Sequence, residues 1–233
     1  MKKLGIIAGI GPASTVEYYK QIIEGYRSRL GTKDYPEMVL HSINMTKMLQ
    51  YVYSGDLDGL VLFLKERIEV LAQAGADFAV LASNTPHLVF DELVKISPLP
   101  MISIVEETCK AIDQKHLTKV ALLGTKSTMT KGFYQRTGLN YGIEIISPNE
   151  ADQDYVHEKY MGELVLNQII PSTKARLISI IEKLKQEHQI EGVVLGGTEL
   201  PLILNQDDFA DLVVFDTTQI HVNSILNQML SES

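Results

Sequence analysis

A short pattern that occurs twice is the feature that most constrains how this chain can fold. Ile-Ile-Ala-Gly at residues 6–9 leads into a loop with hydroxyl side chains, and Ala-Leu-Leu-Gly at residues 121–124 does the same (121 − 6 = 115). Val-Leu-Ala-Ser-Asn-Thr at 80–85 is matched by Val-Leu-Gly-Gly-Thr-Glu at 194–199 (194 − 80 = 114). Chance similarity between buried strands explains either match alone. Two matches at nearly one offset, close to half the chain, indicate a duplication.

Short apolar runs alternate with longer segments of helical periodicity along the chain. This alternation predicts an α/β fold in which helices connect parallel strands. The predicted strands are Leu4–Ala8, Glu37–Ile43, Asp77–Ala82, Met101–Ile104, Lys119–Leu123, Ile143–Ile146, Gly192–Leu195 and Leu212–Phe215. The predicted helices include Thr15–Arg29, Leu57–Ala74, Val105–Ile112, His157–Ile169, Thr218–Leu230 and a segment around residues 177–184.

Repeat and alternation together predict two similar doubly wound lobes with parallel sheets, related by a pseudo-twofold duplication. We expect an N-terminal lobe of residues 1–98 and 206–233, discontinuous because the final helix returns to it. Residues 99–205 are expected to form the C-terminal lobe. Ligands of open α/β sheets bind beyond the carboxyl ends of the strands. We therefore expect the strand-end loops to face a ligand cleft between the lobes.

Composition excludes several classes of function. The chain has 21 Lys+Arg against 29 Asp+Glu, a net charge of −8, which argues against binding a nucleic-acid backbone. Its apolar runs are shorter than the roughly 18 residues of a membrane span, and the first is too short for a signal peptide. The single cysteine, Cys109, is expected to pack in the core, and the histidines lack metal-ligand spacing. We expect a cytoplasmic protein with a small-molecule substrate and no metal.

The loop at residues 9–15 follows the first predicted strand. A dinucleotide-binding fingerprint would need a third glycine where Ser14 stands, so NAD is not expected. Gly11 and Ser14 are expected to shape a tight strand-to-helix turn, with Ser14 or Thr15 capping the helix. Amide groups at such a helix start also attract a carboxylate or phosphate. Both interpretations stay open.

The loop at residues 83–87 follows another buried strand. Thr85 is expected to be the N-cap of a helix and Pro86 its first residue. For His87 we favour a structural role over that of a base. Capping alone does not explain three consecutive small polar side chains, Ser83 to Thr85, directly after a buried strand.

Two further loops lie in the second half of the chain. The loop after residue 124 contains Thr125, Lys126 and further hydroxyls, which suit an anionic ligand but lack the frame of a nucleotide phosphate loop. In the loop at 196–201, glycines permit close backbone approach before Thr198 and Glu199. This loop is either a capping turn or a place where Glu199 orients a substrate ammonium or carries a proton.

Taken in this order, the loops resemble the cofactor-independent aspartate/glutamate racemase family, most closely its aspartate racemase branch. The resemblance rests on Gly-Ile-Gly-Pro-x-Ser-Thr at 9–15, Ser-Asn-Thr-Pro-His at 83–87, Leu-Leu-Gly-Thr at 122–125, Gly-Gly-Thr-Glu-Leu-Pro at 196–201 and Asp-Thr-Thr-Gln-Ile-His at 216–221. It implies two α/β lobes with the active site between them, often in a homodimer. It also implies an isomerase that acts on an acidic amino acid without pyridoxal phosphate (PLP) or another cofactor.

The family's chemistry needs an acid/base group on each face of the α-carbon, and each lobe normally supplies one thiol. The matching positions here are Ser83 and Gly197, so neither thiol is present. A serine hydroxyl is a poor base unless another group activates it. Other candidates for moving the proton are His87, Glu199 and an ordered water. The residues expected to bind or enclose the substrate are Gly11, Ser14, Asn84, Thr85, Thr125, Lys126 and Thr198, with Lys47 a second basic candidate for a distal carboxylate.

Three hypotheses therefore remain. The chain is an amino-acid racemase that works by altered means, or a non-catalytic binder of an acidic amino acid or related carboxylate on the racemase fold. The third hypothesis is a different carbon-acid reaction, such as isomerisation or decarboxylation.

Overall fold

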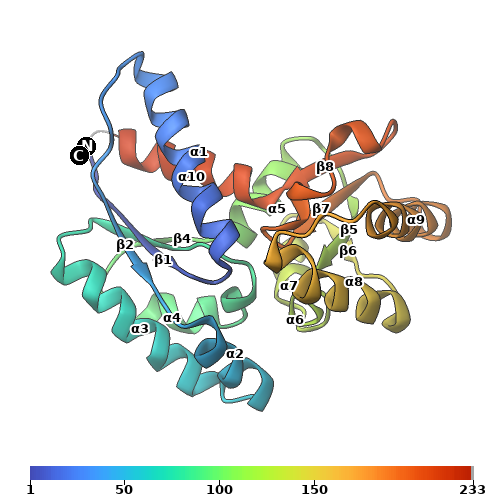
Figure 1. Cartoon of the computed structure of the whole chain (residues 1–233), viewed down its shortest axis with the longest axis horizontal. Coiled ribbons are helices and arrows are strands. Elements are labelled where there is room, and N and C mark those ends of the chain that lie inside the picture. The colour runs from blue at the N-terminus through green and yellow to red at the C-terminus, as the bar shows by residue number, and fades with distance from the viewer. Residues whose placement is uncertain (232–233) are drawn as a thin grey trace. The chain divides into compact units, whose positions relative to one another are not determined.

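The computed structural model describes residues 1–231 of the chain and contains two compact units (Figure 1). The first unit consists of Met1–Ile104 and residues 221–231, and the second of Val105–Ile220. Among the described residues, no helix combines the length and the apolar character needed to cross a membrane.

A parallel four-stranded sheet forms the centre of the first unit. Its strands are β1 (Leu4–Ala8), β2 (Met38–Ser42), β3 (Phe78–Leu81) and β4 (Met101–Ile102), in the order β2-β1-β3-β4. Its helices are α1 (Pro12–Leu30), α2 (Met45–Ser54), α3 (Leu57–Gln73), α4 (Phe90–Ile96) and a short 3-10 helix, η1 (Thr85–Val89). The final helix α10 (Thr217–Leu230) spans the division between the units and gives most of its length to the first.

The second unit is built around a second parallel sheet. Its strands are β5 (Lys119–Gly124), β6 (Glu144–Ile146), β7 (Gly192–Gly196) and β8 (Val213–Asp216), in the order β6-β5-β7-β8. Its helices are α5 (Ile104–Asp113), α6 (Lys126–Thr130), α7 (Phe133–Leu139), α8 (Glu150–Gly162) and α9 (Pro171–His188), with short 3-10 helices η2 (Leu164–Leu166), η3 (Leu200–Leu202) and η4 (Gln206–Asp208).

Both sheets have the same strand order, and the repeated sequence pattern falls on equivalent strands. Residues 6–9 and 121–124 end β1 and β5, which are the first strands of their units. Residues 80–85 and 194–199 run out of β3 and β7, which are the third. The prediction of two similar doubly wound lobes with parallel sheets is confirmed.

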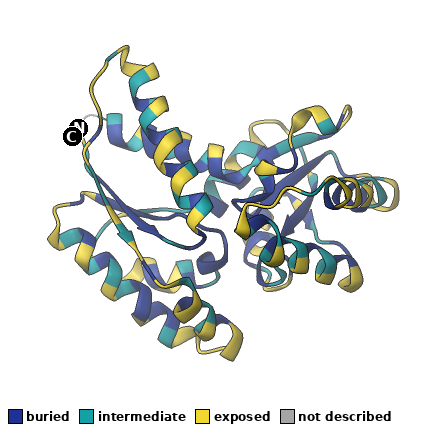
Figure 2. Cartoon of the chain, viewed as in Figure 1, coloured by how far each residue is buried: buried dark blue, intermediate teal, exposed yellow. Residues whose placement is uncertain are grey.

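Burial explains why the central strands β1, β3, β5 and β7 are continuous apolar runs. In the first unit, Ile6 and Val80 pack under α1 and α10, whereas Ile7 and Leu81 pack under α2 and α3 on the opposite face (Figure 1). Strands covered on both faces have no solvent-facing positions to fill with polar residues. Each fully buried aliphatic side chain contributes about 1.5–3 kcal/mol to the free energy of folding. The central strands β1, β3, β5 and β7 are accordingly dark in Figure 2, whereas the edge strands are partly exposed and the helices are exposed along one side.

The units divide at different residues from those we predicted. We placed the divisions after residue 98 and before residue 206, whereas the structure divides after Ile104 and after Ile220. Strand β4 pairs with β3, which keeps residues 99–104 in the first unit. Strand β8 pairs with β7, which keeps residues 206–216 in the second. Strand pairing therefore explains why both divisions lie further along the chain than we predicted.

One predicted helix is displaced along the chain. We expected a helix over His157–Ile169, but α8 runs from Glu150 to Gly162. The Asn149 side chain accepts the N–H of Asp152 and so caps the start of this helix. As a result, Tyr160 lies near the end of α8.

Candidate functional site

In each unit, two candidate loops leave neighbouring strands at the same edge of the sheet. In the first unit the loops follow β1 and β3, and the Ser14 hydroxyl donates to the Ala82 carbonyl (3.3 Å) to join them. In the second unit the loops follow β5 and β7, where a Cβ added to Gly124 would lie 2.6 Å from the Gly196 carbonyl oxygen. The glycine there allows the two backbones to approach closely.

The first loop differs from the prediction at its helix start. Helix α1 begins at Pro12 with Gly11 as its N-cap, not at Thr15. The Thr15 hydroxyl accepts the Gly9 N–H (2.8 Å) and donates to the Gly11 carbonyl (3.0 Å), while Ser14 donates to β3, so the expected cap by either residue was wrong. Gly9 has φ +82°, and a Cβ there would lie 2.6 Å from the Ile43 carbonyl oxygen. These contacts hold the loop in a single shape.

A cavity of about 350 Å³ opens beside this loop, at the carboxyl ends of β1 and β2. Its lining is mainly apolar and consists of Gly9, Pro12, Thr15, Ser42, Ile43 and Met45.

The second loop buries its polar side chains. Ser83, Asn84, Thr85 and His87 are all buried at the end of β3. We expected Thr85 to be an N-cap, but it is the first residue of the 3-10 helix η1, and Asn84 stands at the cap. Pro86 lies in the first positions of this helix, as expected.

Both ring nitrogens of His87 bind backbone groups. Nδ1 lies 2.9 Å from the Ser83 carbonyl oxygen and therefore donates, and Nε2 accepts the Ile104 N–H (3.2 Å). Burial, followed by the nearby His221, lowers the pKa of His87 to about 3. The ring therefore stays neutral in one tautomer and fixes the backbone at Ser83. This geometry favours the structural role over that of a proton carrier.

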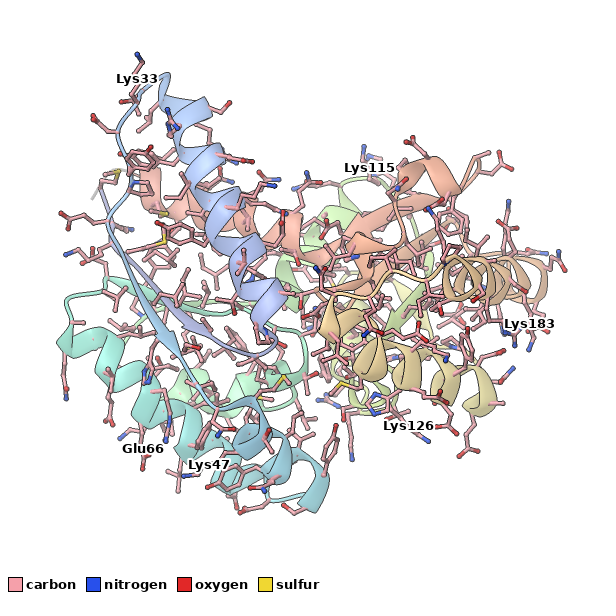
Figure 3. All side chains as sticks on the ribbon, viewed as in Figure 1. Lys33, Lys47, Glu66, Lys115, Lys126 and Lys183 are labelled. Atoms are coloured by element: carbon pink, nitrogen blue, oxygen red, sulfur yellow. The ribbon has the colours of Figure 1, made fainter. Side chains whose placement is uncertain are left out.

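The third loop begins the short helix α6, and its lysine forms an ion pair. Thr125 caps α6 by accepting the Thr128 N–H (3.2 Å). The Lys126 ammonium forms an ion pair with Asp154 on α8, and this hydrogen bond raises the lysine's pKa. The Lys47 ammonium lies 5.8 Å from the centre of the Phe63 ring. Figure 3 labels both lysines.

The fourth loop holds a buried carboxylate. Glu199 is 1% exposed, and its Oε2 accepts the hydroxyl of Tyr160 and that of Thr198 (3.0 Å). Burial and the adjacent carboxylate raise the pKa of Tyr160 well above its usual value, so the phenol remains a donor. Glu199 precedes the 3-10 helix η3, but its side chain binds α8 rather than the helix start.

Tyr160 also occupies the space beside Gly197. A Cβ on Gly197 would lie 2.4 Å from Cε2 of the Tyr160 ring and 3.1 Å from its hydroxyl oxygen. Sequence reasoning missed Tyr160 because it lies on a helix remote from the loop in sequence. The available signal was Gly197 itself, because a glycine in a buried loop leaves room that another side chain fills.

Cys109 lies in α5 and is fully buried. Burial, followed by the charge of Glu106, raises the pKa of its thiol to about 12. Its burial agrees with the expected packing role. Among residues 1–231, no group of three or more His, Cys, Asp or Glu side chains is arranged to hold a metal ion.

Residues 7–225 match the model of the Asp/Glu/Hydantoin racemase family. The chain is 25% identical over 231 residues to the broad specificity amino-acid racemase RacX of Bacillus subtilis (strain 168), covering 98% of each chain. It is 36% identical to the crystal structure of an aspartate racemase homologue from Pyrococcus horikoshii OT3, with a TM-score of 0.85 and coverage of 99% and 100%. A candidate Asp/Glu racemase from Yersinia pestis is 33% identical, with a TM-score of 0.90 and the same coverage.

Proposed function

Because the chain belongs to the Asp/Glu/Hydantoin racemase family, we propose that it is a cofactor-independent amino-acid racemase of the aspartate/glutamate class. The observation that carries this proposal is the pair of equivalent sheets, each with buried polar side chains directly after its third strand. The family resemblance implies that these polar loops hold the substrate's carboxylate and the enolate formed from it.

The proposed binding groups lie on strand-end loops that the family resemblance implies hold the substrate. Asn84 and Thr85 follow β3, and Thr125 and Thr198 lie on loops of the second unit. Side-chain amides and hydroxyls of this kind donate hydrogen bonds to a carboxylate, and they stabilise negative charge that develops on its oxygens. Gly11 and Ser14 would keep the first loop in the shape that completes the site.

Proton transfer must differ from that of a two-thiol racemase. Ser83 and Gly197 stand where the family's thiols are expected, and a serine hydroxyl needs activation to act as a base. The two ring nitrogens of His87 are bound to backbone groups, which leaves Ser83 to be positioned rather than deprotonated by this ring. Glu199 is the remaining acidic candidate of the second unit.

A specific observation favours a second candidate function. The Tyr160 ring fills the space that a side chain at residue 197 would need. A chain in which this ring blocks the reacting position would bind an acidic amino acid or related carboxylate without turning it over.

Calorimetry and chiral chromatography separate the two functions. We expect aspartate or glutamate to bind, and each enantiomer of that amino acid to yield the other. Asn84→Ala should weaken binding by about tenfold or more, because a lost hydrogen bond to a charged group costs about 1.5–3 kcal/mol. Binding without inversion would favour the binder. Absence of binding by both amino acids would contradict the proposal.

The expected homodimer and cytoplasmic location rest on the family resemblance and the composition alone. Both stay predictions.

A further inference from the structure

We propose that Tyr160 and Glu199 together replace the second thiol, with the Tyr160 hydroxyl meeting the α-proton of the substrate and Glu199 holding it. This inference rests on the proposed racemase function. It names a residue, Tyr160, that none of the sequence motifs contains.

The first support is the position of the Tyr160 hydroxyl relative to Gly197. Its oxygen lies 3.1 Å from the position of a Cβ on Gly197, the atom from which a cysteine thiol would extend. Its ring carbon Cε2 lies closer still, at 2.4 Å. The absence of a side chain at residue 197 thus makes room for a different proton-bearing group. The hydroxyl is a proton-bearing group beside the position from which a thiol at residue 197 would extend.

The second support is the partner of the phenol. The Tyr160 hydroxyl donates to Oε2 of Glu199, and the Thr198 hydroxyl donates to the same oxygen. Both Tyr160 and Glu199 are buried, at 6% and 1% exposure. A charged carboxylate is costly to bury, so a proton that arrives there removes part of that cost. The hydrogen bond gives the proton a direct route from one side chain to the other.

The charges on Tyr160 and Glu199 determine which of the two acts as the base. Burial raises the pKa of Tyr160 most, and the Glu199 carboxylate raises it further, because a phenolate beside it would place two negative charges in contact. Tyrosine alone is therefore a poor base here. The carboxylate is the base, and the phenol passes the proton on without becoming charged.

The forward step conserves atoms and charge. The Cα–H bond breaks as its proton moves to the Tyr160 oxygen, and the Tyr160 proton moves to Oε2 of Glu199 at the same time. The electron pair of the broken bond stays on the substrate as an enolate, so the negative charge moves from Glu199 to the substrate. In reverse, Glu199 returns its proton to the Tyr160 oxygen while the phenol proton goes to Cα. One pair therefore serves as acid and as base on one face of the substrate.

The proposed proton relay runs from the substrate through Tyr160 to Glu199. Exchange of the α-proton with D2O, measured by NMR for each enantiomer separately, tests this relay. Tyr160→Phe keeps the ring and removes the hydroxyl, and Glu199→Gln keeps the shape and removes the base. Each variant should slow exchange of one enantiomer by about 100-fold or more, and both variants should affect the same enantiomer. Exchange of the other enantiomer should change far less, because its α-proton lies on the opposite face of the α-carbon, away from this pair. Tyr134→Phe is the matched control, since it removes another buried hydroxyl of the second unit.

A double variant tests the relay by a gain of exchange, which a misfolded protein would not show. Tyr160→Ala with Gly197→Cys supplies a thiol and removes the ring that would clash with it. We expect it to restore exchange of the affected enantiomer.

The outcomes separate this inference from the proposed function. If the unmodified protein exchanges neither aspartate nor glutamate, the racemase function fails and the relay fails with it. If the unmodified protein exchanges but Tyr160→Phe behaves like Tyr134→Phe, the relay alone is wrong. Equal slowing of both enantiomers would also overturn it, since that indicates a general structural effect.

Discussion

Lowering the pH from 7 to 5 is expected to reduce the free energy of unfolding by about 2 kcal/mol through His87 alone. The pKa of this ring is about 3 in the folded chain, against an ordinary value of 6.5. Between these values the unfolded chain binds a proton that the folded chain excludes. The contribution is therefore fully present above about pH 6.5, and it is lost as the pH falls toward 3.

Urea unfolding at pH 7 and pH 5 measures this effect. The unmodified protein should lose about 2 kcal/mol more than His87→Gln between the two pH values, because glutamine cannot titrate. His188→Gln, at an exposed position, serves as the control and should keep the pH dependence of the unmodified protein. An equal pH dependence for His87→Gln and the unmodified protein would contradict this, because it would show that His87 binds its proton equally well in the folded and unfolded chain.

Gly197→Ala is expected to destabilise the second unit by about 1–3 kcal/mol, because the added methyl meets the Tyr160 ring at 2.4 Å. The cost should largely disappear in a Tyr160→Leu background, which gives a coupling energy of about 1–3 kcal/mol in a double-mutant cycle. Urea unfolding of the four proteins in the cycle measures it.

A glycine on the Tyr160 helix provides the control for this cycle. Within residues 1–231, no atom beyond its chain neighbours and helix backbone lies within 4 Å of a Cβ built on Gly162, so Gly162→Ala should be neutral or slightly stabilising. If Gly197→Ala behaves like Gly162→Ala, the ring does not fill the space beside Gly197. For the same reason, a thiol introduced at residue 197 should be at least as costly as Ala unless the Tyr160 ring is removed.

The central strands could be predicted because each is covered on both faces. Continuous apolar runs such as Leu4–Ala8 then have few other interpretations, and their spacing shows the duplication. Helix starts were less predictable, since α1 begins at a proline after Gly11 and α8 at the Asn149 cap. The unit boundaries depend on which strands pair, and sequence spacing does not encode that choice.

The site was predictable only where its residues follow strands. The loop at 83–87 could be found in this way, because polar residues directly after a buried strand need a reason to be there. Contacts made by side chains across the fold could not be found. The pairing of Lys126 with Asp154 and the filling of the Gly197 space by Tyr160 depend on how α8 packs beside the loops.

The central claim is that this chain moves the α-proton of an amino acid without a thiol. Cys109→Ala tests it most directly, because Cys109 is the only cysteine in the chain. Aspartate and glutamate, each enantiomer separately, are incubated in D2O with the unmodified protein and with Cys109→Ala, and α-deuterium is followed by NMR. We predict deuterium at the α-carbon of both enantiomers of one amino acid, at similar rates with both proteins. Loss of exchange in a folded Cys109→Ala, or no exchange with either protein, would contradict the claim.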